Sequence, residues 1–576
     1  MLALFAPATF FRRRLSAPGR RTPQARFWLI VIALTLLAGG LRLWGVESRS
    51  LWQDEVFTAS SATGNRLFEA TILPDAYRLD PPDASAPAYY RHLAMGWRPW
   101  SAFVDGIAHN VQTPLYPTLM RLWMRLFGPD PVRARFFSVL CGILCIPAMA
   151  WLGRLAGGNR LGLAACAILT LSGFQIIYSQ TARLYPLLTL LVLLGAALTL
   201  VIAQRCQRDS AVARIKWGTW AIWAALQVAG LYTHYFYVFA LAFQILWLWR
   251  ATRDDRRARI ALIGACAATA AAAACWAPMW LRQQAFLANI GHGSLSGLWR
   301  PLTLIERLWK LGAELVSPKS VWIQLWVSAI VLASGAFACW GRLRKQPLAQ
   351  ILQNTPAWLR FSALWLACVV GGLLAVDLIS NTHRIFSSRY LILASPALYL
   401  LIAGATLSLP RRAARVAGVT LAALMALNAG AVLSGEKFLR KEDYRGAGQY
   451  IARHRASGDI TLACHSAVHA AGLAYYLPES MPLAGVSRRN AGVDWPPEAL
   501  QERLKTLLKG RSGAFLALCH CRPALAERLR RGIEAQGFRL ADRVTLSSMQ
   551  ALRYVRVPST SGSDYRRRET PRSDRP

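Results

Sequence analysis

The sequence predicts a mainly α-helical protein that crosses a membrane many times and carries a small α/β domain near its C-terminal end. Hydrophobic residues occupy 54% of the 576 positions, and the mean hydropathy is +0.29. About 11 apolar stretches are long enough to cross a bilayer, for which roughly 20 residues suffice. Beyond residue 435 these stretches give way to short strand and helix patterns. Together these observations indicate a polytopic membrane protein rather than a large soluble one.

The first apolar stretch covers residues 27–46 and follows a basic segment, residues 1–26. Arginines that precede a span favour the cytoplasmic side, so we expect this segment there. The stretch is too long for a signal peptide and lacks a small-residue cleavage site, which indicates a retained anchor. Ten further spans complete a transmembrane domain that we place at residues 27–434. These predicted spans are 136–156, 160–178, 184–203, 217–233, 235–249, 260–281, 321–340, 361–380, 390–408 and 414–434.

The net charge of +38 is explained by topology. Every loop that these spans place in the cytoplasm is basic, as the positive-inside rule expects. The same count puts the loops 47–134 and 282–320, and the C-terminal domain, on the outer side. No compact basic domain with a known nucleic-acid motif is present, so we expect a lipid bilayer and no nucleic acid as partner.

This topology requires that residues 113–128 do not cross the membrane. The segment is short for a span, and Arg121 and Arg125 lie one helical turn apart on the same face. A helix with an apolar stripe and a narrow basic face is expected to lie in the interface plane. The alternative is a short, tilted span, which would invert the topology downstream and spoil the alternation of basic loops.

The region 435–557 is predicted to be a soluble α/β domain, followed by a disordered tail at 558–576. Residues 460–463 and 514–518 are predicted strands, and residues 444–454 and 523–536 are predicted helices. Three cysteines fall in this domain: Cys464, Cys519 and Cys521. A disulfide between two of them is favoured, while three free thiols or a metal site with the neighbouring histidines remain alternatives. The spacing matches no standard zinc pattern, and no metal site is assigned.

Asp54 and Glu55 are the first candidate site residues. They occur in Leu51-Trp52-Gln53-Asp54-Glu55-Val56, directly after the first span, and therefore emerge close to the outer headgroups. Acids are common in outer loops, where they are often merely solvated. Paired carboxylates among apolar and aromatic residues at a membrane surface suit a general base that acts on a lipid-borne substrate.

Arginines at the outer ends of later spans are the second candidate group. Arg183 lies between aromatic residues in 178–186, and Arg384 and Arg389 lie in 382–390. Outer arginines run against the positive-inside bias, and a bound phosphate would explain them. Arginines that snorkel to headgroups are the alternative. His234 marks another outer turn, where it could be a simple interface residue.

Charges are nearly absent from the interiors of the spans. Transporters usually place ionisable residues at mid-membrane depth and often show inverted repeats, and neither feature is found. The charged residues gather at the outer rim instead, which indicates chemistry on a lipid at the surface.

These motifs resemble those of the GT-C superfamily of glycosyltransferases that use lipid-phosphate sugars. The nearest branch is the bacterial one related to protein O-mannosyltransferases and to the aminoarabinose transferase of lipid A, including RgtA/B/C/D-like enzymes. The similarity runs from about residue 27 to 410 in the family's order. The matching segments are Leu51-Trp52-Gln53-Asp54-Glu55, Thr113-Pro114-Leu115-Tyr116 with the helix after it, Tyr178-Ser179-Gln180-Thr181-Ala182-Arg183-Leu184-Tyr185, and Ser388-Arg389-Tyr390.

The resemblance implies a GT-C fold with about 11 transmembrane helices, juxtamembrane helices in the first periplasmic loop, and a location in the bacterial inner membrane. It implies a polyprenyl-phosphate sugar donor and an acceptor hydroxyl on an envelope glycolipid such as lipopolysaccharide, a polysaccharide or a protein. The implied roles are a base for Asp54 supported by Glu55, donor-phosphate binding for Arg183, Arg389 and Arg384, and substrate binding for Tyr116, Tyr185, His234 and Tyr390. No cofactor is assigned, and the need for a divalent metal stays open.

The chain departs from the family pattern at two places. Thr181 stands where many members have an acid, and a single proline, Pro114, replaces the usual His-Pro-Pro or Lys-Pro-Pro. The alternatives are a flippase or transporter of lipid-linked glycans and a non-catalytic subunit with the same fold. An oligosaccharyltransferase that moves a whole glycan is disfavoured because the Trp-Trp-Asp-Tyr-Gly signature is missing.

Overall fold

The computed structural model describes most of the chain. The described residues are 23–67, 85–207, 215–288, 355–380, 384–434, 441–464, 467–486 and 496–558, with the single positions 314, 325 and 329. Nearly all of the predicted span 321–340, most of the loop 282–320, the segment 1–22 and the tail beyond 558 lie outside these residues.

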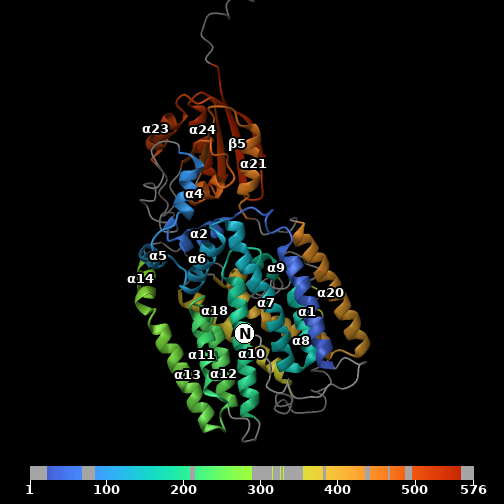
Figure 1. Cartoon of the computed structure of the whole chain (residues 1–576). Coiled ribbons are helices and arrows are strands. Elements are labelled where there is room, and N and C mark those ends of the chain that lie inside the picture. Colours follow the sequence, from blue (N-terminus) through green and yellow to red (C-terminus); the bar gives the residue numbers. More distant parts are fainter. Residues whose placement is uncertain are drawn as a thin grey trace, which may run out of the picture.

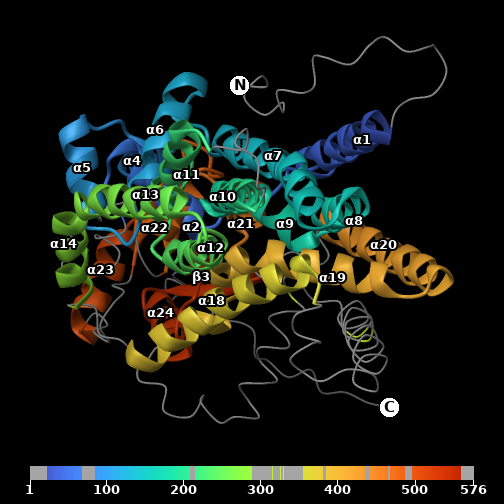
Figure 2. The same ribbon diagram turned by 90° about the horizontal axis from the view of Figure 1, so that it is seen from below.

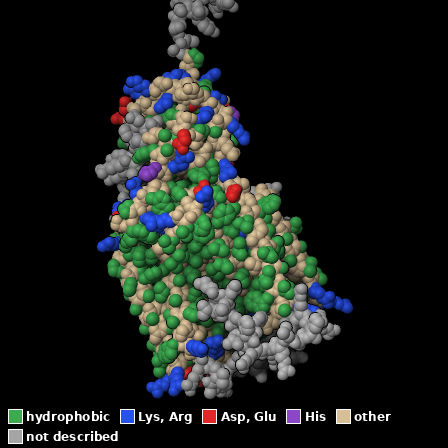
Figure 3. All heavy atoms as spheres, in the orientation of Figure 1, with side chains coloured by type: hydrophobic (Ala, Val, Ile, Leu, Met, Phe, Trp, Pro, Cys, Tyr) green, Lys and Arg blue, Asp and Glu red, His purple; other side chains and the backbone are tan. Residues whose placement is uncertain are grey.

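Within the described residues, seven helical segments are long and apolar enough to cross a membrane. They are α1 (Pro23–Leu43), α7 (Pro131–Gly157), α10 (Tyr185–Cys206), α13 (Arg256–Ala274), α18 (Ala357–Ser380), the continuous pair η5 (Ser388–Ala394) and α19 (Ser395–Ser408), and α20 (Arg411–Leu433). Figure 1 shows them as a bundle with a sheet at one end, and Figure 2 shows α10 among α7, α11 and α12. Apolar side chains cover much of the bundle on the face in Figure 3, as expected for a multi-pass membrane protein.

The predicted span 160–178 is broken into two helices, α8 (Asn159–Leu171) and α9 (Gly173–Ser179), which meet at 60°. Ser172 caps α9 by accepting a hydrogen bond from the backbone N–H of Gln175 at 3.4 Å. The fully buried Arg42 of α1 donates to the freed carbonyl of Leu169 at 3.2 Å and to that of Thr170 at 3.4 Å. The bend therefore has a definite cause, because a side chain satisfies the backbone groups that the helix releases there. If the bent pair counts as one span, the described residues hold eight.

Other predicted spans differ from the structure in length. The predicted spans 217–233 and 235–249 correspond to α11 (Trp217–Leu231) and α12 (Tyr237–Ala251), each of 15 residues. Fifteen residues extend about 22 Å, which is less than the usual hydrocarbon thickness. The predicted span 260–281 ends early, because α13 stops at Ala274 and a new helix, α14 (Ala277–Ala288), follows after a short turn.

Four short helices lie between the bundle and the sheet: α2 (Gln53–Thr63), α4 (Pro87–Met95), α5 (Trp100–Ala108) and α6 (Leu115–Phe127). Helix α6 has 13 residues and is not among the membrane-crossing segments, which agrees with the prediction for 113–128. However, one arginine of its basic face, Arg121, is not directed towards the headgroups. Arg121 is fully buried and lies 4.6 Å from the ring centroid of Trp100, and it donates to the carbonyl of Ala62 at 2.9 Å. The arginine thus holds α6 against α5 and the end of α2.

The C-terminal part folds around a five-stranded mixed sheet of order β2-β1-β3-β5-β4. Its strands are β1 (Ile460–Ala463), β2 (Leu483–Gly485), β3 (Gly513–Cys519), β4 (Phe538–Thr545) and β5 (Met549–Arg556). Strands β2, β1 and β3 are parallel, whereas β5 is antiparallel to both β3 and β4. The helices of this part are α21 (Tyr444–His454), α22 (Ala467–Ala474), α23 (Pro497–Leu508) and α24 (Pro523–Glu534).

The two faces of the sheet bury different clusters. One face packs against α23 and α24 through residues such as Leu504 and Leu529. The other packs against α21 and α22, and its cluster extends to Leu51 and Val56 around α2 and to Tyr90 of α4. Residue 85 adds an antiparallel bridge to Leu483 at the edge of β2. The sheet therefore packs directly against the helices that follow the first span.

The expected disulfide is wrong. Among the described residues, no disulfide involves Cys464, Cys519 or Cys521, although Cys464 follows β1 and Cys519 ends the neighbouring strand β3. Parallel neighbouring strands bring these two ends close, and the backbone N–H of Cys464 donates to Ala517 at 2.9 Å. Cys464 and Cys519 are instead buried on opposite faces of the sheet. Cys464 lies in the cluster with α23 and α24, and Cys519 lies in the cluster with α21 and α22.

Candidate functional site

The start of α2 fixes the acidic pair in space. Asp54 and Glu55 lie in its first turn, where carboxylates interact favourably with the helix dipole. At the other end, Gly64 has φ +90° and closes the helix with hydrogen bonds to Ser60 and Ser61. A side chain at this position would approach Arg98 and Phe103 to 3.1–3.3 Å, so glycine suits both the conformation and the space.

Glu55 is buried and paired on both oxygens with Arg135 of α7. The two contacts are 2.8 Å from Nε to Oε1 and 2.7 Å from Nη2 to Oε2, and both side chains are 1% exposed. Oε1 of Glu55 also accepts the backbone N–H of Ala182 at 2.8 Å. The remaining donors of Arg135 hold the carbonyls of Val46, Arg49 and Ser50. The Glu55–Arg135 pair is therefore a structural link that joins α2, α7, the segment between α1 and α2, and the turn that carries Arg183.

Asp54 is the accessible member of the pair, with 21% of its side chain exposed. Its Oδ2 lies 3.5 Å from Nη2 of Arg183 and 3.4 Å from Nη1 of Arg389. Arg183 is fixed further by bonds from Nη1 to the Asp54 carbonyl and to the Thr58 hydroxyl, at 3.1 and 3.2 Å. Burial lowers the pKa of Arg183, but the Asp54 carboxylate together with Tyr185 and Tyr116 more than offsets this effect, so the pKa is raised. The site thus holds one carboxylate facing two guanidinium groups.

Both arginines have donor capacity to spare. Nε of Arg183 and Nε of Arg389 are buried and make no hydrogen bond within the part of the chain that the structure describes. Buried donors without a partner are costly, and a bound phosphate oxygen would satisfy them.

Aromatic residues from three segments complete the site. Tyr185 lies under Arg183, with 5.9 Å from the guanidinium carbon to the ring centroid, and Tyr390 lies 5.2 Å from that of Arg389. His234 and Phe236 stand 6.0 and 5.5 Å from the Tyr390 ring, centroid to centroid. Arg384 lies over Phe236 at 5.9 Å. The structure therefore brings Asp54, Arg183, Arg389, Arg384, Tyr185, Tyr390 and His234 together.

Tyr116 is placed differently from these site residues. Its side chain is 1% exposed, and its hydroxyl lies 3.4 Å from that of Ser138, which in turn donates to the carbonyl of Arg183 at 3.1 Å. Tyr116 thus packs behind the arginine and supports it indirectly.

His234 is expected to stay neutral across the working pH range. Its Nδ1 accepts the backbone N–H of Phe236 at 3.1 Å, so that nitrogen carries no proton. Burial, together with the nearby charges of Arg183, Arg384 and Arg389, lowers the pKa of His234 to about 4.

This shift predicts a pH-dependent contribution to stability. Between the ordinary value of 6.5 and about 4, the unfolded chain binds more protons at this position than the folded chain. The contribution is therefore fully present above pH 6.5 and is lost as the pH falls towards 4. His234→Asn keeps an acceptor for Phe236 but cannot titrate, so its melting temperature is expected to fall less than that of the wild type between pH 7 and 4. Equal falls in thermal-unfolding measurements would contradict the assignment.

Several residues that support the site were not predicted from the sequence. Arg135 opens α7 and resembles any basic residue that flanks a span. Asp377 is buried near the end of α18 and accepts the backbone N–H groups of Arg384 and Ile385 at 3.0 and 2.7 Å, which positions the segment that leads to Arg389. Lys441 lies 3.6 Å from the ring centroid of Trp52, the residue before α2. Only three-dimensional contacts reveal these roles, because the partners are far apart in sequence.

Thr181 shows what replaces the missing second acid. It is 2% exposed, and its hydroxyl donates to the carbonyl of Tyr178 at 2.9 Å. The position is used to shape the turn between α9 and α10, which carries Arg183.

Comparison with known proteins supports the fold. No protein-family model and no curated protein matches the chain. The structure is similar to that of ArnT from Cupriavidus metallidurans in the apo state, with 15% identity, 92% of this chain and 98% of that chain covered, and a TM-score of 0.52. The same protein bound to undecaprenyl phosphate gives 14% identity, the same coverage and a TM-score of 0.47. The oligosaccharyltransferase AglB from Archaeoglobus fulgidus, in complex with an inhibitory peptide and a dolichol-phosphate, shows 11% identity. The match covers 92% of this chain and 74% of that chain, with a TM-score of 0.44. The likeness to apo ArnT confirms the predicted GT-C fold.

Proposed function

We propose that the protein transfers a sugar from a polyprenyl-phosphate donor to an acceptor hydroxyl at the outer rim of the bundle. The observation that supports this most directly is the meeting of the partly exposed Asp54 with Arg183 and Arg389. The fold shared with apo ArnT agrees with a membrane glycosyltransferase. Following the positive-inside rule, we place this rim on the periplasmic side of a bacterial inner membrane.

The two guanidinium groups would stabilise the leaving phosphate. A sugar on polyprenyl phosphate departs easily only if the charge that develops on the phosphate is stabilised, and preorganised arginines do this in a site that excludes water. The free Nε donors of both residues suit phosphate oxygens. Tyr185, Tyr390 and His234 would then line the space for the sugar.

Asp54 would take the proton of the acceptor hydroxyl as the hydroxyl oxygen attacks the anomeric carbon. The bond from that carbon to the phosphate oxygen breaks in the same step, and its electron pair leaves with the phosphate. Asp54 is a partly exposed carboxylate that faces both arginines, whereas Glu55 is fully engaged by Arg135. Transfer with Asp54 as the base corresponds to direct displacement, which inverts the anomeric centre.

The test compares envelope glycolipids, polysaccharides and glycoproteins from cells with and without the gene by mass spectrometry. A single sugar mass missing without the gene would support transfer and would name the donor sugar and the acceptor class. Purified protein in lipid nanodiscs should also release polyprenyl phosphate from that donor. Identical profiles in the two strains, with no release in vitro, would refute the proposal.

Arg389→Ala is expected to raise KM for the donor by about tenfold to 100-fold, with a smaller effect on kcat. The variant removes a charge-assisted hydrogen bond to phosphate, a contact worth roughly 1.5–3 kcal/mol. Arg389→Lys should recover only part of the loss, because an ammonium group cannot bind bidentately. The matched control is Arg253→Ala, which removes an arginine that is 65% exposed in the turn after α12 and should leave KM unchanged. An unaltered donor KM in Arg389→Ala would exclude a phosphate role.

A further inference from the structure

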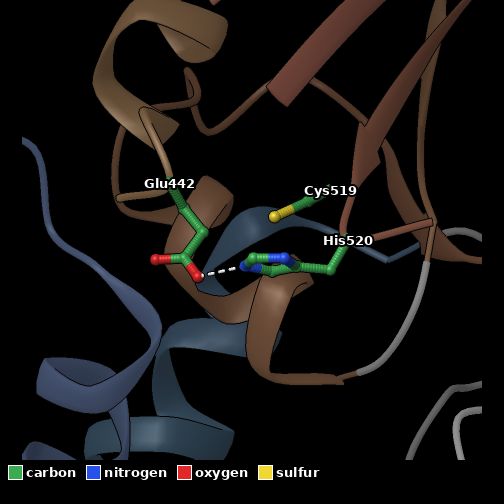
Figure 4. Close-up of side chains that lie close together, drawn as sticks. All are labelled: Glu442, Cys519 and His520. Atoms are coloured by element: carbon green, nitrogen blue, oxygen red, sulfur yellow. Dashed lines mark hydrogen bonds and ion pairs between the residues drawn. The ribbon is translucent and has the colours of Figure 1, made fainter. Parts of the chain in front are cut away.

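A second cluster of polar side chains lies where the sheet meets the start of α2. It consists of Glu442, Cys519 and His520, which Figure 4 shows facing one another. Nε2 of His520 lies 2.6 Å from Oε1 of Glu442, and one ligand atom from each residue lies within 4.8 Å of the other two. Cys519 and Glu442 are buried, with exposures of 1% and 5%, whereas 45% of the His520 side chain is exposed.

The backbone at His520 brings two consecutive residues to the same side. Successive side chains of a strand normally point to opposite faces, and Cys519 is the last residue of β3. His520 has φ +49°, the left-handed region, and is the one non-glycine residue with positive φ among those described. This conformation costs about 1 kcal/mol for a residue with a Cβ, and it lets the imidazole approach Glu442 together with the thiol.

An imidazole nitrogen, a thiolate and a carboxylate are the three ligand types that Zn²⁺ binds in proteins. Two of the three side chains are fixed by burial, and the exposed edge of His520 leaves room for a fourth ligand such as water. The sequence spacing matched no zinc pattern because the third ligand lies 78 positions from His520. We propose that Glu442, Cys519 and His520 form a Zn²⁺-binding site.

The position of this site gives it a consequence for α2. The second oxygen of Glu442 accepts the backbone N–H of Gln53 at 3.2 Å, and Gln53 is the first residue of α2 and the neighbour of Asp54. The bound cation would join the end of β3, the segment before α21 and the start of α2. The cation would stabilise the position of the helix that carries Asp54, and it would take no part in the transfer step.

The site is tested with metal-stripped, full-length protein in detergent. Equilibrium dialysis against Zn²⁺ should show one bound ion per chain, with affinity at least about tenfold weaker in Cys519→Ser and in Glu442→Gln. Co²⁺ added in place of Zn²⁺ should give the charge-transfer absorption of a cobalt–thiolate bond. That band should be absent in Cys519→Ser and retained in Cys521→Ser, the matched control two positions along the chain.

Thermal unfolding gives a second measurement that does not depend on the cysteine variant. Zn²⁺ should raise the melting temperature of the wild type clearly more than that of Glu442→Gln or His520→Asn, because a ligand that binds only the folded state stabilises it in proportion to its affinity. The absence of a bound ion in the wild type would overturn the proposal and leave a simple Glu442–His520 hydrogen bond. A cobalt–thiolate band that survives in Cys519→Ser, or disappears in Cys521→Ser, would also overturn it.

Discussion

Replacing Asp54 by Asn is expected to abolish sugar transfer while leaving the protein folded and able to bind its donor. An amide cannot accept the acceptor's proton, and general-base catalysis is worth about 10²–10⁴-fold in rate. The change also removes the negative charge that faces Arg183 and Arg389. Both guanidinium groups would then be free for the donor phosphate, so the donor Kd should stay the same or decrease.

The measurement is a single-turnover assay combined with donor binding by the purified variant. The matched control is Asp105→Asn, which removes a carboxylate of α5 that is 47% exposed and paired with Arg66. Loss of transfer with intact donor binding in Asp54→Asn alone would support the assigned role. Normal kcat in Asp54→Asn would refute Asp54 as the base, and a loss of donor binding would show that the residue acts by holding the arginines.

Breaking the Glu55–Arg135 pair is expected to have the largest effect on stability. Arg135→Met leaves a buried carboxylate without its partner and also removes the donor from three backbone carbonyls. Removing one member of a buried ion pair typically costs about 3–5 kcal/mol. Chemical or thermal unfolding in detergent should show this loss, and Glu55→Gln should show a similar one.

The double variant Glu55→Leu with Arg135→Met separates two explanations. If the cost arises from an unpaired buried charge, the double variant should be more stable than Arg135→Met, because apolar replacement of both partners is often nearly neutral. The variant still lacks the bond to Ala182, so the turn that carries Arg183 should be held less firmly and the donor KM should rise. Additive stability losses would contradict the pairing argument.

The sequence predicted the features that depend on length, hydropathy and local pattern. The helices 444–454 and 523–536 and the strands 460–463 and 514–518 correspond closely to α21, α24, β1 and β3. Strand β4 was missed because its residues after Phe538 are nearly all exposed, so it shows no apolar alternation. Strand β2 was missed because it has only three residues.

For the candidate site, too, the sequence predicted only what local pattern and position indicate. Asp54 was proposed as a candidate through its place after the first span, and Arg183 and Arg389 through their outer positions. The residues that hold them were not found, because their contacts join distant segments: Arg135 reaches back 80 positions to Glu55, and Glu442 reaches back 389 to Gln53. No local pattern encodes such pairs. The periplasmic orientation and the domain limits stay predictions.

Arg42 has a consequence for how the bundle assembles in the membrane. Its guanidinium bonds to carbonyls near residues 169–170 and to the hydroxyl of Ser179, all of which are synthesised more than 120 residues later. Until those segments insert, the side chain can reach water only by extending towards the headgroups at the nearby end of α1. The bonds of Arg42 to α8 and α9 can form only after those helices have been synthesised, and docking of α1 against them turns the side chain inward.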